Sequence, residues 1–155
     1  MQELAGKTAF VTGGASGIGL ALARSFAQAR MQVMLADIET DALAVAVKSL
    51  REAGAEVRGV TCDVADPVSL GRAAEAAFAA FGKVHVLCNN AGVAAGSGIE
   101  HIALDTWRWV LDVNLMGVLH GIAAFLPHIR AHGDGGHIVN TASMAGLASG
   151  MGFSP

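Results

Sequence analysis

The sequence predicts an α/β protein whose single sheet is parallel and doubly wound. Short runs rich in β-forming residues alternate along the chain with longer segments of helical periodicity, as in other parallel α/β proteins. The strand-like runs are apolar throughout, which is typical of strands covered by helices on both faces. A third observation is a glycine-rich turn between the first strand and the first helix.

Five strands and four helices follow from this pattern. We expect strands at residues 7–12, 32–37, 56–62, 84–88 and 137–141. We expect helices at residues 17–29, 40–53, 67–81 and 104–132, with Pro67 in the first turn of its helix. Right-handed crossovers between the strands then give the order 3-2-1-4-5.

The composition narrows the class of protein. The chain has 155 residues, of which 53% are hydrophobic and 15% are charged, as expected for a single globular domain over residues 1–155. A formal net charge of -3 with scattered basic residues argues against nucleic-acid binding. Polar residues interrupt the apolar stretches before a membrane span of roughly 20 residues is reached. The N-terminus does not resemble a secretion signal, so we expect a cytoplasmic protein.

Two apolar features predict contacts outside the predicted domain. The helix at 104–132 is apolar on nearly all sides, so it is either a deeply buried core helix or a helix shared with a partner subunit. We favour the second. The fifth strand would be an unprotected apolar sheet edge, which suggests that further C-terminal strands are missing and the domain is incomplete.

The glycine-rich turn, residues 12–19 (TGGASGIG), predicts a phosphate-binding loop of the Rossmann type. Glycine permits a sharp turn and a close approach of backbone N–H groups to a pyrophosphate, and the helix that follows adds the positive end of its dipole. A glycine triplet alone could serve any tight turn, but a strand precedes this one and a helix follows it.

Asp37 closes the second strand eighteen residues after Gly19, where a carboxylate would accept hydrogen bonds from the adenosine ribose. The same charge would repel the additional phosphate of NADP, and the loop carries Ser16 rather than a basic residue. NAD is therefore favoured over NADP. The alternative role of Asp37 is to cap the next helix.

Taken together, these motifs resemble the short-chain dehydrogenase/reductase family over essentially the whole chain. The matching residues are Thr12, Gly13, Gly17 and Gly19, then Asp63 and Val64, then residues 89–92 (NNAG), then Asn114 and Ser143. Each motif taken alone could have a purely structural role, such as forming a turn. The resemblance implies an NAD(P)-dependent oxidoreductase that acts on a small alcohol or carbonyl substrate. It implies that the cofactor is bound by Gly13, Ser16, Gly17, Ile18, Gly19, Asp37, Asp63, Val64, Asn90, Ala91 and Gly92.

The resemblance also assigns catalytic roles to Ser143 and Asn114. The family's catalytic Tyr and Lys would lie beyond Pro155, and the chain contains no tyrosine. We therefore expect a truncated chain that is inactive alone. The alternatives are a non-catalytic dinucleotide-binding or interaction module, and half of a split enzyme. The resemblance further implies a homo-oligomer built through the long helix, or association with a missing C-terminal fragment.

The other polar and aromatic candidates have structural explanations. Cys62 and Cys88 lie in apolar runs and are expected to be buried, reduced thiols. His128 and His132 could hold a metal by spacing, but no third ligand is evident, so we expect solvated histidines and no metal. His85, where the family has Asp, is expected to be a tolerated structural change. Trp107 and Trp109 are expected to pack in the core or against the substrate loop.

Overall fold

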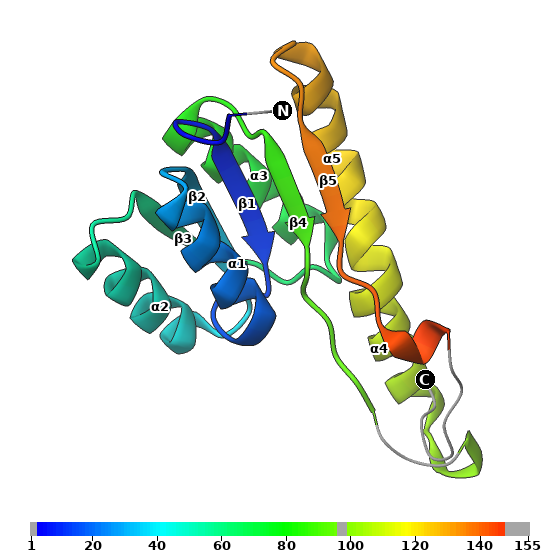
Figure 1. Ribbon diagram of the computed structural model, residues 1–155. Helices are drawn as coiled ribbons and strands as arrows, with labels where there is room; N and C mark the ends of the chain where they lie inside the picture. The colour runs from blue at the N-terminus through cyan, green and yellow to red at the C-terminus, as the bar shows by residue number, and fades with distance from the viewer. Residues whose placement is uncertain (1–2, 96–98, 148–155) are drawn as a thin grey trace.

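The computed structural model describes residues 3–95 and 99–147 and has three layers, a parallel sheet between two layers of helices (Figure 1). The strands are β1 (Thr8–Thr12), β2 (Gln32–Asp37), β3 (Val57–Thr61), β4 (Val86–Asn89) and β5 (His137–Asn140). All neighbouring strands are parallel and their order is β3-β2-β1-β4-β5, which confirms the predicted topology.

Helices α1 (Gly17–Gln28) and α2 (Thr40–Glu52) cover one face of the sheet, and α3 (Pro67–Phe81) and α5 (Gly117–Ala131) cover the other. The strands alternate their side chains between these faces, so the sheet has two apolar cores. Val11 and Leu35 belong to the first core, while Phe10 and Phe125 belong to the second, with ring centroids 4.5 Å apart. The helix at 67–81 begins as predicted, because the Asp66 side chain caps it by accepting from the Val68 N–H.

The predicted helix over residues 104–132 is interrupted. Helix α4 (Leu104–Leu111) leads into a π-helical turn, η2 (Asp112–Met116), and α5 follows directly. The Gly117 N–H donates to the Asp112 carbonyl, a spacing of five residues rather than four. We call this continuous helical segment, Leu104–Ala131, the rod. It extends beyond the carboxyl ends of the strands (Figure 1).

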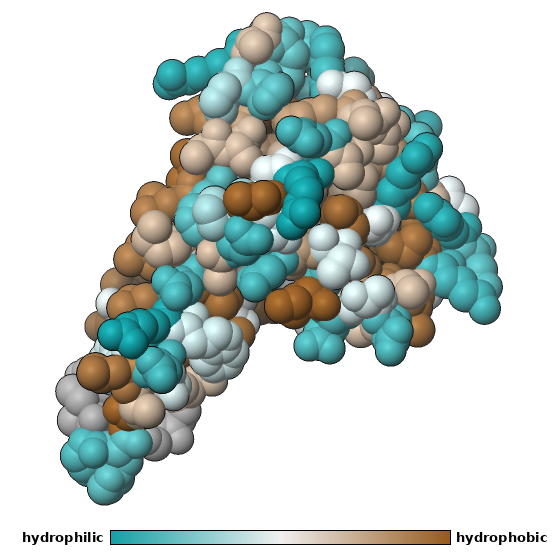
Figure 2. Space-filling model, turned by 180° about the vertical axis from the view of Figure 1, so that it is seen from behind, coloured by the Kyte–Doolittle hydropathy of each residue, from teal (hydrophilic) through white to brown (hydrophobic). Residues whose placement is uncertain are grey.

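The rod is buried on one side only within the described residues. Val110, Phe125 and Ile129 pack inward, whereas Leu111, Leu115 and Leu119 are each about half exposed. The alternative of a deeply buried core helix is therefore wrong. The sheet covers one face of the rod and leaves the other as apolar surface (Figure 2). By length and composition alone the rod could span a membrane. Its other side packs against β4 and α3, where Phe125 and Ile129 belong to the second core.

Strand β5 lies at the edge of the sheet formed by the described residues, and Val139 on it is 46% exposed. Its sequence, HIVN, carries no Lys, Asp or Glu that would oppose pairing with another strand. The apolar edge predicted from the sequence is thus present.

Candidate functional site

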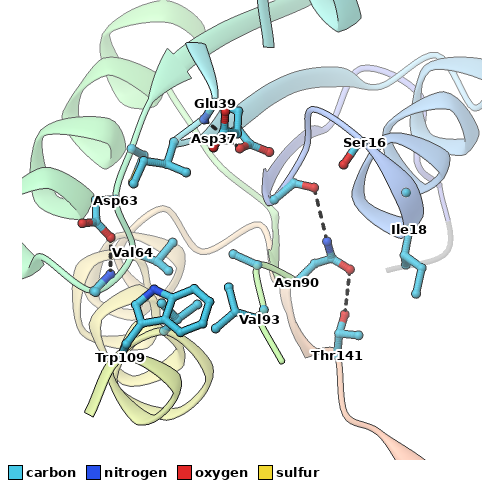
Figure 3. Close-up of a pocket in the computed structure, with 18 residues that line it drawn as sticks. Ser16, Ile18, Asp37, Glu39, Asp63, Val64, Asn90, Val93, Trp109 and Thr141 are labelled. Atoms are coloured by element: carbon cyan, nitrogen blue, oxygen red, sulfur yellow. Dashed lines mark hydrogen bonds between the residues drawn. The ribbon is translucent and has the colours of Figure 1, made fainter. Parts of the chain in front are cut away.

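A pocket of about 610 Å³ opens at the carboxyl ends of the central strands, where a doubly wound sheet binds its ligands. It lies between the glycine-rich turn after β1 and the turns after β2, β3 and β4 (Figure 3). Its volume is in the range that accommodates a small-molecule ligand or cofactor. The pocket brings together side chains and backbone from segments that are far apart in the sequence.

The glycine-rich turn forms the wall of the pocket at the N-terminus of α1. Gly13 and Gly17 have φ angles of 62° and 51°, a left-handed conformation that other residues adopt with strain. Gly19 lies so close to Gly13 that a Cβ atom added there would overlap the Gly13 carbonyl oxygen. The turn therefore needs glycine at these positions, and the first N–H groups of α1, which no side chain caps, lie at the wall of the pocket.

Asp37, at the end of β2, faces the same pocket. Its Oδ2 accepts a hydrogen bond of 2.9 Å from the Ala15 N–H in the glycine-rich turn, and its Oδ1 accepts one of 3.1 Å from the Glu39 N–H. These bonds hold the carboxylate against the turn. Because each carboxylate oxygen can accept two hydrogen bonds, Asp37 can still accept one more at each oxygen, as from the two hydroxyl groups of a diol.

The turn after β3 forms the far side of the pocket. Asp63 Oδ1 accepts from the Ala65 N–H at 2.9 Å, and the Asp63 N–H donates to Ser69 Oγ at 3.1 Å. His120 of α5 donates from its Nδ1 to the Val64 carbonyl oxygen at 2.9 Å. The position of Val64 is thus set by α5 as well as by β3.

Thr12 and Asn90 join the ends of the central strands. The Thr12 hydroxyl accepts from the N–H groups of Asn90 and Ala91 at 2.9 and 3.0 Å, and donates to the Cys88 carbonyl oxygen. The Asn90 amide donates to the Thr12 carbonyl oxygen at 3.1 Å and accepts from the Thr141 hydroxyl at 3.1 Å. Asn90 therefore fixes the relative positions of three strand ends, and its side chain has little capacity left for a ligand.

The two predicted catalytic residues lie beside the pocket rather than in its wall. The Asn114 side chain accepts from the Val93 N–H and donates to the Val93 carbonyl oxygen, both at 2.8 Å. Ser143 lies two residues beyond Thr141, which does line the pocket, and its Oγ accepts from the Ala145 N–H at 3.1 Å. Its hydroxyl proton remains free to be donated.

The structure brings most of the predicted cofactor residues together. Of the eleven, only Gly19 does not line the pocket, because it packs against Gly13 behind the wall. Eight further residues line the pocket that the sequence did not predict, in the turns after β2, β3, β4 and β5 and in the rod: Ile38, Glu39, Cys62, Ala65, Val93, Trp109, Val113 and Thr141. Val113 could have been found from the sequence, because it directly precedes the predicted site residue Asn114.

Of the two placements predicted for Trp109, the core is wrong, whereas the position beside Val93, in the segment after β4, agrees with packing against the substrate loop. Its side chain is 48% exposed and lines the pocket beside Val64 and Val93 (Figure 3). The apolar character of the rod hid this residue, since helical periodicity cannot separate a buried face from a face that lines a pocket.

Both cysteines are free and buried, as predicted. Burial raises the pKa of the Cys62 thiol and of the Cys88 thiol to about 11. Cys62 lines the pocket but is therefore present as a poorly reactive thiol at neutral pH.

A second polar cluster lies at the opposite end of the sheet. The structure brings His85 and Asp134 to His132, with one potential ligand atom of each within 4.8 Å of the others. The hydrogen bonds explain the cluster without an ion. His85 Nδ1 accepts from the Thr8 N–H at 3.1 Å, which leaves the proton of the neutral ring on Nε2.

His132 is also fully used, because its Nδ1 accepts from the Asp134 N–H and its Nε2–H donates to the Val84 carbonyl oxygen, both at 3.1 Å. Neither ring offers a lone pair to a metal in these tautomers. The prediction of a solvated histidine is wrong for His132, since the turn after α5 folds back onto β4. His128 is exposed and stacks on Phe78.

Known proteins resemble this chain closely. The family described as short chain dehydrogenase matches residues 7–155. A short-chain dehydrogenase/reductase from Burkholderia phymatum, solved in complex with NAD, is 47% identical with a TM-score of 0.96, covering 99% of this chain and 54% of that chain. The 1-deoxy-11-beta-hydroxypentalenate dehydrogenase of Streptomyces avermitilis is 42% identical over 153 residues, 97% of this chain and 57% of the relative.

The C alpha-dehydrogenase of a Sphingobium species is 37% identical over 148 residues, 95% of this chain and 48% of the relative. The chain thus spans about half the length of the curated relatives that it matches. The family match covers nearly every residue, and the fold and the pocket agree with it. The chain belongs to the short-chain dehydrogenase/reductase family.

Proposed function

We propose that this chain is the NAD-binding portion of an oxidoreductase that transfers hydride between the nicotinamide of NAD and an alcohol or carbonyl carbon. The observation that carries the proposal is the arrangement of the Asp37 carboxylate beside the glycine-rich turn in one pocket. Family membership and a relative solved with NAD support it.

The pocket fits a dinucleotide. The space in front of Gly13 and Gly17 and the free N–H groups at the start of α1 suit the pyrophosphate. Asp37 would accept from the adenosine ribose hydroxyls. Asp63 and Val64 would contact the adenine, since they lie next to Asp37 along the pocket (Figure 3).

The charges in the pocket favour NAD over NADP. None of the 18 residues that the structure places around the pocket is Lys or Arg, whereas Asp37, Glu39 and Asp63 are acidic. The 2′-phosphate of NADP would therefore meet a carboxylate with no cation to offset the repulsion.

The bound cofactor would accept the hydride as NAD when an alcohol is oxidised and would donate it as NADH when a carbonyl is reduced. The Ser143 hydroxyl would donate a hydrogen bond to the substrate oxygen. Asn114 would hold the segment around Val93 in place at the side of the pocket. The chain has no tyrosine to transfer the proton, so we expect the 155 residues alone not to turn over substrate.

The exposed side of the rod is our candidate for subunit association. Leu111, Leu115 and Leu119 are spaced four residues apart and form an apolar surface on it. We propose a cytoplasmic homo-oligomer, or association with further C-terminal sequence along β5. A non-catalytic dinucleotide-binding module is the alternative function, favoured by the same pocket.

The test is NADH binding to the purified chain, followed by fluorescence, with Asp37→Ala as the control variant. We expect saturable binding that Asp37→Ala weakens, with NADPH binding more weakly than NADH. A folded chain that binds neither nucleotide contradicts the proposal. Binding together with turnover of a panel of alcohols would contradict the expected inactivity of the chain alone.

A further inference from the structure

Trp109 occupies an unusual position for a large aromatic residue. It lies in the last turn of α4, its side chain is 48% exposed, and it lines the pocket. Val113 is four residues later, lines the same pocket and packs against the second core. Residues four apart share one face of a helix, so this face of the rod forms a wall of the pocket.

The indole lies at a defined end of the pocket. In Figure 3 it is beside Val64 and Val93, on the side of the pocket away from Ser16 and the start of α1. The glycine-rich turn would hold the pyrophosphate and Asp37 the adenosine ribose, so the base attached to that ribose would reach the turn that carries Asp63 and Val64. The indole borders that part of the pocket.

We propose that Trp109 is an adenine-binding residue, whose indole stacks against the base of the cofactor. The inference rests on the proposed NAD site and adds to it a side chain that covers the base from the rod. A base presents an aromatic face whatever its edge groups are, and an indole is the largest surface that a side chain can offer to it.

The exposure of Trp109 agrees with this role. A bound base would remove apolar indole surface from water, whereas the described residues leave about half of the side chain uncovered. Val64 and Val113 line the same pocket as the indole, so aliphatic side chains would contribute to the contact with the base. Contact with a second subunit is the competing explanation of the exposure.

The chain allows a direct measurement, because it has two tryptophans and no tyrosine. In Trp107→Phe, Trp109 is the only source of indole emission, and in Trp109→Phe, Trp107 is. Each variant is titrated with ADP-ribose, AMP and nicotinamide mononucleotide. We expect ADP-ribose and AMP to change the Trp109 emission saturably, nicotinamide mononucleotide to leave it unchanged, and Trp107 emission to respond to none of them.

Affinities measured by calorimetry provide the second readout. Trp109→Leu should weaken ADP-ribose binding about 5-fold, a change of about 1 kcal/mol at the lower end of the range for base–aromatic stacking, because one indole face stays near water. Trp109→Phe should restore most of the affinity, since it keeps an aromatic face. Circular dichroism of each variant checks that the chain is folded.

The outcomes separate the two proposals. ADP-ribose binding that Asp37→Ala weakens but Trp109→Leu does not, with Trp109 emission unchanged, overturns the role of Trp109 and leaves the NAD site intact. A response to nicotinamide mononucleotide instead of AMP also overturns the assignment to adenine. A folded chain that binds neither NAD nor ADP-ribose overturns the NAD site, and the role of Trp109 with it.

Discussion

The side-chain amide of Asn114 and the backbone of Val93 form two hydrogen bonds of 2.8 Å each, so the amide is paired at both its donor and its acceptor. Asn114 belongs to the π-helical turn and Val93 to the segment after β4. This pairing attaches the pocket-lining segment to the rod. In this structure the Asn114 side chain therefore holds the segment around Val93 in position.

Replacing Asn114 with Ala should loosen the segment around Val93. We expect the free energy of unfolding to fall by about 1 kcal/mol, because both bonds are accessible to water and water replaces part of what is lost. Urea denaturation measures the loss, and hydrogen exchange should be faster at the Val93 amide. Leu115→Ala, which removes an exposed side chain from the same turn, should leave that amide protected.

Replacing Gly19 with Ala should disrupt the glycine-rich turn. The new methyl group would overlap the Gly13 carbonyl oxygen, so the turn must shift, at a cost of about 1–3 kcal/mol in stability and with loss of NADH binding. The matched control is Gly71→Ala in α3, where a methyl group meets no atom within 4 Å. That change should stabilise the chain by about 0.5–1 kcal/mol. Equal NADH affinity in both variants would contradict the role of the turn.

The chain should lose stability in mild acid through His85. Burial lowers the pKa of His85 below its ordinary 6.5, and the charges of Lys7 and His132 lower it further, while Asp134 opposes them. The unfolded chain then binds the proton more readily. The stability linked to neutral His85 is therefore complete above 6.5 and is lost as the pH falls below that value.

His85→Asn isolates this contribution, because its amide oxygen can still accept from the Thr8 N–H but does not titrate. Between about pH 7.5 and about pH 5.5, urea midpoints should fall more for the original chain than for the variant. Parallel decreases would show that other groups cause the acid sensitivity. The pKa of Asp134, lowered mainly by its hydrogen bond from Lys83, affects stability only in stronger acid.

The two thiols should react only when the chain unfolds. Since burial raises both pKa values to about 11, a disulfide reagent at about pH 8 should label neither cysteine rapidly in the folded chain and both in urea. NADH should slow any residual labelling of Cys62, which lines the pocket, more than that of Cys88. Rapid labelling of folded Cys62 would show an open or mobile pocket wall.

Most of the sheet and much of the pocket could be predicted, because both depend on local patterns. The strand order follows from alternating strands and helices, and Gly13 and Asp37 are recognisable by their places at strand ends. The π-helical turn was missed because the residues of Asp112–Met116 are compatible with a regular α-helix as well as with a π-helical turn. Its extra residue is visible only as the Gly117–Asp112 hydrogen bond.

The environment of His85 could not be predicted for another reason. Its partners come from the N–H of Thr8 at the start of β1 and from Asp134 after α5, and only the folded chain brings these segments together. Trp109 presented a third difficulty. On a helix that is apolar on all sides, the residues facing core, pocket and solvent look alike in sequence.

The π-helical turn accommodates one residue more than a regular helix would between α4 and α5. Its i→i+5 hydrogen bond lets the extra residue fit within about the rotation of one α-helical turn, so deleting one residue from Asp112–Met116 would restore regular helix and leave α4 in nearly its present orientation. If all five residues adopted regular α-helix instead, α4 would turn by about 100° relative to α5 and Trp109 would face another direction. A relative one residue shorter between Trp109 and Gly117 would therefore keep this wall of the pocket on a regular helix, and an alignment gap in Asp112–Met116 is the expected sign of it.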